Sequence, residues 1–208
     1  MRTARFGSIA AVGAVATAAF VGGRLTGHSR AGEALARPAS AQPADAMPPA
    51  FALSPMHEHL KHFVGDWDGA VRFRMGPGEE WVESKGTARR ELIFDGRFVV
   101  EHVDAEGMGE GRFQGLGIVG FNTIDNRFES VWIENMATYV STSSGTYDER
   151  TKSFTFEGEM IDPMTGNRMR TRMTMDCSAP DREVATGWTV LPDGTLEKTF
   201  EGVFERKH

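Results

Sequence analysis

The sequence predicts an all-β protein: an antiparallel up-and-down barrel of about eight to ten strands with one short N-terminal helix. From Gly65 onward, apolar and polar residues alternate with a period of two, the period of a strand that buries one face. Short turn sequences such as Asp95-Gly96 separate these runs, and no helical segment is long enough for a parallel crossover. Closing such a meander into a barrel removes its exposed edges.

The N-terminus has the features of an export signal. Two arginines precede an uncharged run of Ala, Gly and Val over residues 6–23, and Ala-x-Ala sites follow at 34–36 and 39–41. We expect residues 1–41 to be a signal peptide or membrane anchor plus linker, and the protein to be exported to the periplasm or secreted. The Ala-x-Ala sites lie farther from the apolar run than is typical of a signal peptide, so an uncleaved membrane anchor is an alternative interpretation.

Residues 42–53 are rich in Pro and Ala without periodicity, which predicts a disordered linker before a barrel domain over residues 54–208. Ser54 and Pro55 are typical of a helix N-cap and first helical position. Met56, Leu60, Phe63 and Val64 then recur at helical spacing until Gly65. The helix is therefore short and amphipathic.

Seven alternating runs follow, and in each we expect the more apolar set to point into the barrel. In chain order these sets are Trp67, Val71 and Phe73; Phe98, Val100 and His102; Phe128, Ser130 and Trp132; Phe154, Phe156 and Met160; Met169, Met173 and Met175; Val184, Thr186, Trp188 and Val190; and Leu196, Phe200 and Phe204.

Charge and cysteine content exclude some classes of partner and bond. Residues 42–208 carry 18 basic and 28 acidic side chains, a formal charge of −10, which argues against nucleic acid as a partner. Cys177 is the only cysteine, so no internal disulfide can form, and its place in an alternating stretch predicts an inert buried thiol.

Two patterns could in principle bind a metal. In a helix His57 and His59 point roughly 200° apart, so that only His59 and His62 could share an ion, and zinc needs three or four ligands. The methionines of "MRTRMTM", residues 169–175, could bind Cu(I) on one face, but methionine more often fills gaps in a core. We therefore expect no metal site.

The segment "GLGIVG", Gly115–Gly120, matches the dinucleotide-binding fingerprint. That fingerprint functions only where a helix begins directly after it, because the pyrophosphate lies on the helix N-terminus. Here a turn and another alternating run follow, so we interpret the match as accidental. We find no nucleophile elbow and no phosphate-binding loop.

Several segments together resemble an uncharacterised bacterial family, the domain of unknown function 1579 family, which is regarded as lipocalin-like. In chain order they are "HEHLKHFVGDW" from His57, "PGEEWVES" from Pro77, "FDGRFVVE" from Phe94, "FQGLGIVGFN" from Phe113, Trp132, "SGTYDERTKSFTFEGEMIDPMTG" from Ser144 and "PDG" from Pro192. Where the family pattern has Tyr-Asp, this chain has Phe121-Asn122.

The resemblance implies a calycin-type barrel but no settled activity. In lipocalins a Gly-x-Trp start, Gly65 and Trp67 here, closes the barrel floor, and a late basic residue stacks on the tryptophan; Arg206 or Lys207 is placed for that role. This motif is structural. Related nitrobindin barrels bind haem through a histidine, which we cannot match to a position here, so the cofactor stays unknown.

With no converging catalytic constellation and no catalytic residue to name, the sequence favours a barrel that binds a small, largely apolar molecule without catalysis. We expect the cavity to be lined by Phe98, His102, Trp132, Met173 and Trp188. Two alternatives stay open: an enzyme or haem protein that uses His102 inside the barrel, and a tethered interaction module whose barrel is filled by side chains. A membrane would be contacted only through an uncleaved N-terminal segment.

Overall fold

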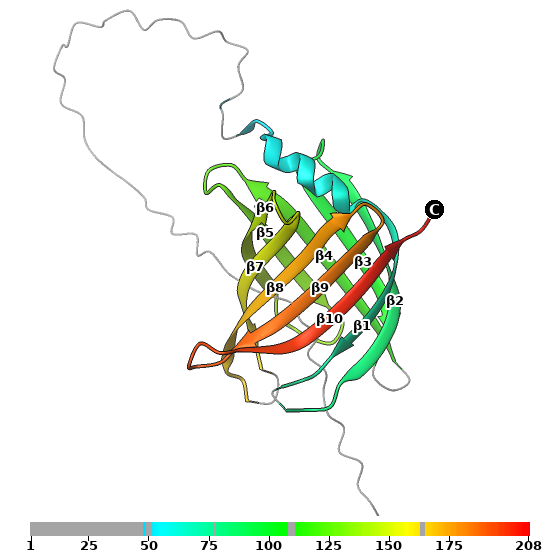
Figure 1. The fold of residues 1–208 in the computed structure, drawn as a ribbon, viewed down its shortest axis with the longest axis vertical. Coiled ribbons are helices and arrows are strands. Elements are labelled where there is room, and N and C mark those ends of the chain that lie inside the picture. Colours follow the sequence, from blue (N-terminus) through cyan, green and yellow to red (C-terminus); the bar gives the residue numbers. More distant parts are fainter. Residues whose placement is uncertain (1–47, 49–50, 77, 108–110, 163–164) are drawn as a thin grey trace, which may run out of the picture.

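The computed structural model describes residues 48, 51–76, 78–107, 111–162 and 165–208 (Figure 1). The expected signal peptide or anchor, residues 1–41, lies outside the described residues, as does most of the expected linker. Within the described ranges, no helix is long and apolar enough to cross a membrane.

One helix, η2 (Pro55–Phe63), precedes the strands at the position that the sequence predicts, and it is a 3-10 helix. The backbone N–H of Ser54 donates to Nδ1 of His57 over 3.0 Å, which ties the first turn together. The helix lies across one end of the barrel (Figure 1) and buries His57, Leu60 and Phe63 against it.

Ten antiparallel strands close into a barrel in which each strand pairs with its neighbours in the chain and the first pairs with the last. The predicted fold class is therefore confirmed. The strands are β1 (Gly65–Phe73), β2 (Val82–Ile93), β3 (Phe98–Glu106), β4 (Arg112–Asn122), β5 (Arg127–Glu134), β6 (Ser141–Asp148), β7 (Ser153–Ile161), β8 (Arg168–Ala179), β9 (Arg182–Val190) and β10 (Leu196–Arg206).

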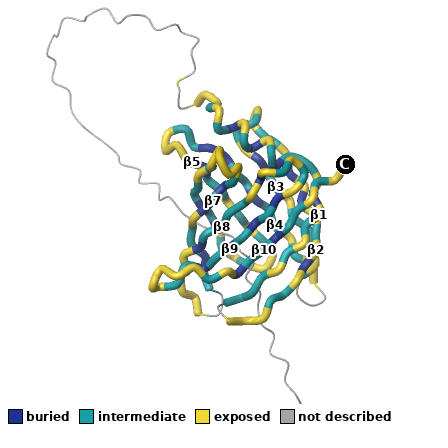
Figure 2. The backbone as a smooth tube through the Cα atoms, in the orientation of Figure 1, coloured by how far each residue is buried: buried dark blue, intermediate teal, exposed yellow. Residues whose placement is uncertain are grey.

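Burial alternates along most strands; Figure 2 shows buried positions in dark blue, intermediate ones in teal and exposed ones in yellow. On four strands the inward set is the one that the sequence predicts. Trp67 on β1, Phe128 on β5 and Phe154 on β7 are fully buried, and Met173 and Met175 on β8 face the interior. On the outer face of the barrel, Arg172 of β8 pairs with Glu157 of β7, as expected for the side chains that alternate with the methionines.

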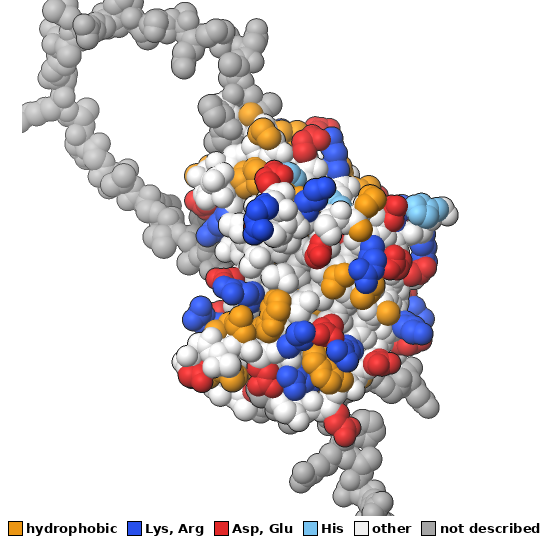
Figure 3. All heavy atoms as spheres, in the orientation of Figure 1, with side chains coloured by type: hydrophobic (Ala, Val, Ile, Leu, Met, Phe, Trp, Pro, Cys, Tyr) orange, Lys and Arg blue, Asp and Glu red, His pale blue; other side chains and the backbone are white. Residues whose placement is uncertain are grey.

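On β3 and β9 the inward orientation that we expected is wrong. Phe98 is 39% exposed and His102 is also exposed, whereas Val99 between them is buried. On β9 the buried positions are Glu183, Ala185, Gly187 and Thr189, so Trp188 points outward. Apolar side chains lie among charged ones on the face formed by β8, β9 and β10 (Figure 3).

The physical reason is that the inward sets of these two strands contain charged or small residues. Glu101 of β3 and Glu183 of β9 are both bound by Arg90, which compensates for their burial. Alternation along a single strand cannot show such a partner. On β10 a bulge between Lys198 and Phe200 shifts the register, which leaves Leu196 41% exposed, while Phe200 faces inward.

The packed core occupies only the end of the barrel next to η2. Rings of Phe63, Phe128 and Phe154 meet there, with centroids 4.9–5.0 Å apart. The cluster consists of Leu60, Phe63, Val99, Phe121, Phe128, Phe154, Phe156 and Cys177. The rest of the interior is less completely filled, and the candidate site lies there.

Candidate functional site

An internal cavity of about 270 Å³ extends through the half of the barrel away from η2. It runs from Arg90 to residues at the opposite end, among them Phe73, Gly107 and Met136. Most of its wall is apolar, with side chains including Val71, Val103, Met173, Met175, Phe200 and Phe204. Its volume is close to the lower limit for ligand pockets.

Two of the five residues predicted to line a cavity, Trp132 and Met173, do so. The other three, Phe98, His102 and Trp188, do not border it, because they lie on the outer side of β3 and β9. His102 instead borders a groove on the outer surface with Arg89 and Leu116.

Trp132 forms part of the cavity wall and lies flat against β4. A Cβ atom at Gly115 would overlap its ring, and one at Gly117 would come within 3.1 Å of it. Its Nε1–H donates to Glu134 over 2.9 Å. Gly115 and Gly117 of "GLGIVG" therefore make room for an indole ring, and the segment is part of a strand, which agrees with rejecting the nucleotide fingerprint.

A few polar groups interrupt the apolar wall. The hydroxyls of Ser130 and Ser143 are 2.7 Å apart, and Ser84 donates to the carbonyl oxygen of Glu106 over 2.7 Å. Thr171 is 5% exposed, and within the described residues its hydroxyl has no hydrogen-bond partner. This hydroxyl could therefore bind a polar group of a ligand.

Arg90 borders the inner end of the cavity and joins one buried carboxylate, Glu183, to one half-buried carboxylate, Glu101. Its Nε–H donates to Glu101 over 2.7 Å and its Nη1–H donates to Glu183 over 2.6 Å. The guanidinium carbon also lies 5.4 Å from the ring centroids of both Trp67 and Phe204. Sequence analysis did not identify this cluster. The only sign of it in the sequence is a charged residue at an inward position of β2, of β3 and of β9.

Burial and neighbouring charges shift the pKa values of Arg90, Glu183 and His62. Burial lowers the pKa of Arg90, but the two carboxylates outweigh it and raise the pKa. Burial raises the pKa of Glu183 despite the attraction of Arg90. Burial, followed by the charges of Arg206 and Arg90, lowers the pKa of His62, which favours a neutral imidazole.

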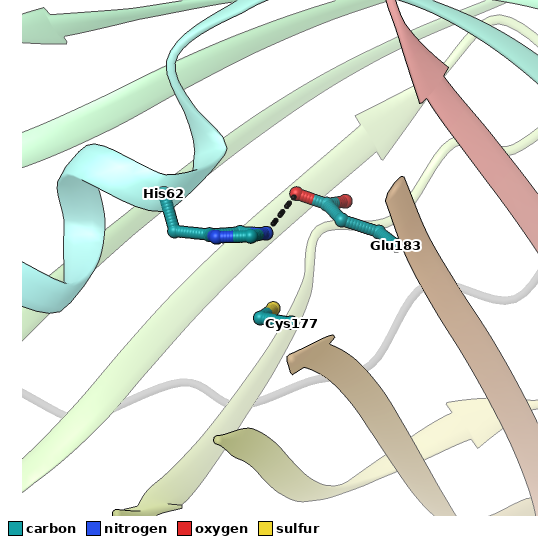
Figure 4. Close-up of side chains that lie close together, drawn as sticks. All are labelled: His62, Cys177 and Glu183. Atoms are coloured by element: carbon teal, nitrogen blue, oxygen red, sulfur yellow. Dashed lines mark ion pairs between the residues drawn. The ribbon is translucent and has the colours of Figure 1, made fainter. Parts of the chain in front are cut away.

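The three histidines of the helix have separate environments. His57 faces the barrel and accepts the N-cap hydrogen bond. His59 lies 2.8 Å from Glu149 and stacks on Tyr147 with ring centroids 4.0 Å apart. His62 points toward Glu183, with Nε2 3.5 Å from Oε1 (Figure 4).

At the closed end of the barrel, Arg206 stacks on Trp67, with its guanidinium carbon 4.1 Å from the ring centroid. Its donors bind the carbonyl oxygens of Val64 and His62, and Asp181 accepts from its Nε–H over 3.1 Å. Gly65 has φ +130°, and a Cβ there would come within 2.8 Å of the guanidinium. Lys207, the other candidate for this position, pairs instead with Asp68.

Two solved structures have a similar barrel. Rv2717c from M. tuberculosis is 14% identical with a TM-score of 0.53, and the match covers 76% of this chain and 100% of that one. The S-type phycobiliprotein lyase CPES from Guillardia theta is 10% identical with a TM-score of 0.53, covering 74% and 93%. A search of curated proteins finds no match.

At these identities the likeness shows the fold alone. The family comparison reaches further, because the model described as "Protein of unknown function (DUF1579)" matches residues 53–206, the helix and all ten strands. The chain therefore belongs to the DUF1579 family.

Proposed function

We propose that the barrel binds a small, largely apolar molecule in its internal cavity without catalysis. The observation that carries this proposal is the division of the interior: side chains fill the end next to η2, whereas a cavity of about 270 Å³ with a mostly apolar wall occupies the remainder. Burial of an apolar ligand in such a cavity is favourable in proportion to the area removed from water.

The polar groups of the wall narrow the ligand class. Thr171 offers one hydroxyl that can donate or accept, and within the described residues it has no hydrogen-bond partner. Arg90 and Glu101 form a charged pair at the inner end. A ligand with an apolar body and one hydrogen-bonding group complements this wall.

The similar barrel from Guillardia theta carries the name phycobiliprotein lyase. A shared fold supports only the view that such a barrel can serve a small-molecule function, not a particular ligand. The alternative that uses His102 inside the barrel is contradicted by its exposed, outward position on β3. The cavity also argues against the alternative of a barrel filled by side chains.

Fluorescence titration with N-phenyl-1-naphthylamine, an apolar dye, tests the proposal. Val103→Trp places an indole in the cavity and should weaken dye binding by about tenfold or more, because the space is lost. His102→Trp adds the same side chain on the outer face of the same strand and serves as the matched control. Absent dye binding, or equal binding by both variants, contradicts the proposal.

Native mass spectrometry of the full chain tests it without a variant. The chain is purified from a rich lysate, and its native mass is compared with its denatured mass. A discrete additional mass of a small organic molecule supports the proposal.

We also infer that the protein is exported. The arginines before an uncharged run at residues 6–23 and the Ala-x-Ala sites after it support this inference. Cell fractionation, with mass measurement of the recovered chain, tests it and distinguishes a cleaved signal from a retained anchor.

A further inference from the structure

Three side chains with metal-binding atoms converge between the helix and the barrel wall. His62 comes from η2, Cys177 from β8 and Glu183 from β9 (Figure 4). One ligand atom from each lies within 4.8 Å of the other two. We propose that this cluster binds a divalent transition-metal ion of the zinc class, at a site separate from the ligand cavity.

The chemistry of the donors matches such an ion. Imidazole nitrogen, thiolate sulfur and carboxylate oxygen are the three ligand types of protein zinc sites. Zinc bonds of about 2.0–2.3 Å in tetrahedral geometry place neighbouring ligand atoms roughly 3.3–3.8 Å apart. The 3.5 Å between Nε2 of His62 and Oε1 of Glu183 already fits. The sulfur of Cys177 needs to approach by about 1 Å at most.

The two nearest ligand atoms are buried without hydrogen bonds. Glu183 is 0% exposed, and within the described residues neither its Oε1 nor Nε2 of His62 has a hydrogen-bond partner. Buried polar atoms without partners are costly, so native structures seldom retain them. A metal ion between the two atoms would satisfy both at once.

The charges of the surroundings also favour a divalent ion. With its carboxylates ionised, the Arg90 cluster has one positive and two negative charges. A divalent cation together with a Cys177 thiolate makes the group electrically neutral, which lowers the cost of burial. Arg206 is balanced separately by Asp181.

Neighbouring hydrogen bonds position the proposed ligands. Arg90 binds Oε2 of Glu183 and leaves Oε1 directed toward His62. Arg206 donates to the backbone carbonyl of His62 over 2.8 Å and anchors that turn of the helix. Such outer contacts orient ligands and raise metal affinity. Three protein ligands leave the fourth position of a tetrahedral site for water.

Sequence analysis predicted no metal site because it combined the histidines only with one another, along the helix, where His59 and His62 could supply two ligands. The structure directs His59 to Glu149 instead and brings Cys177 and Glu183 to His62 from strands far along the chain.

Cobalt(II) titration of the full, tag-free chain after treatment with EDTA provides the test. We expect one cobalt per chain, intense visible ligand-field bands and a near-ultraviolet thiolate-to-cobalt band, all reversed by zinc. Because Cys177 is the only cysteine, a thiolate band can arise from no other residue of the chain. This measurement therefore needs no variant.

Variants then identify the other ligands. Cys177→Ser should abolish the thiolate band, and His62→Ala should weaken cobalt binding by about 100-fold or more. His59→Ala removes a histidine of the same helix and should change neither the thiolate band nor the affinity for cobalt. Far-UV circular dichroism confirms that each variant is folded. If the wild-type chain binds no cobalt, or shows no thiolate band, or binds equally well with His62→Ala, the proposal is overturned.

Discussion

Arg90 on β2 and Glu183 on β9 form a buried ion pair of 2.6 Å across the two strands that separate them in the barrel, β1 and β10. Their side chains are 4% and 0% exposed. Glu101 of β3 is bound by the same guanidinium, so one arginine joins three strands. This relationship explains why charged residues occupy the inward face of strands whose outward face is more apolar.

The first prediction concerns this ion pair. Arg90→Met should lower the free energy of unfolding by about 3–5 kcal/mol, because Glu183 and Glu101 are left without their buried counter-charge. Equilibrium urea unfolding in the presence of EDTA measures the loss. Arg90→Met combined with Glu183→Gln should be more stable than Arg90→Met alone. A loss below about 1 kcal/mol for the single variant would match an exposed pair and contradict the assignment.

The second prediction compares two hydroxyls of the cavity wall. Thr171→Val removes a buried hydroxyl that has no hydrogen-bond partner within the described residues, so it should stabilise the protein by about 1 kcal/mol. Ser143→Ala breaks the 2.7 Å contact with Ser130 and should destabilise it by a similar amount. Urea unfolding of both variants measures the two changes in the free energy of unfolding, which should have opposite signs. Changes of the same sign would contradict the prediction.

The third prediction concerns the closed end of the barrel. Arg206→Lys should destabilise the protein by about 1–3 kcal/mol, because an ammonium cannot reproduce the planar contact with Trp67 or reach several carbonyl oxygens at once. Arg182→Lys alters an exposed pair with Glu205 and should stay within about 0.5 kcal/mol of the wild type. Chemical denaturation of the two variants distinguishes them, and equal losses would show that the Arg206 contacts add nothing.

The fourth prediction concerns the glycines under Trp132. Gly115→Ala should cost about 1–3 kcal/mol and shift tryptophan fluorescence, because the new methyl group displaces the indole ring. At Gly111 a Cβ meets no atom within 4 Å, so Gly111→Ala is the matched control. Thermal unfolding followed by fluorescence tests both, and an unchanged midpoint for Gly115→Ala would contradict the packing described.

The sequence correctly predicted which face of a strand is buried wherever the more apolar set of side chains points into the barrel. Trp67, Phe128 and Phe154 are examples, because a large apolar side chain has no competing reason to face water there. It failed on β3 and β9, where Glu101 and Glu183 face inward and His102 and Trp188 face outward. Both cavity residues that it identified, Trp132 and Met173, lie on strands of the first kind.

The sequence by itself determined the period-two alternation, the short turns and the capped helix, and with them a closed antiparallel barrel, because these features depend on residues near one another in the chain. Only the tertiary structure decided which face of β3 and β9 is buried, where the interior stays unfilled, and that His62, Cys177 and Glu183 meet. A buried charge is tolerated only where a partner compensates it, and here that partner, Arg90, comes from a distant strand.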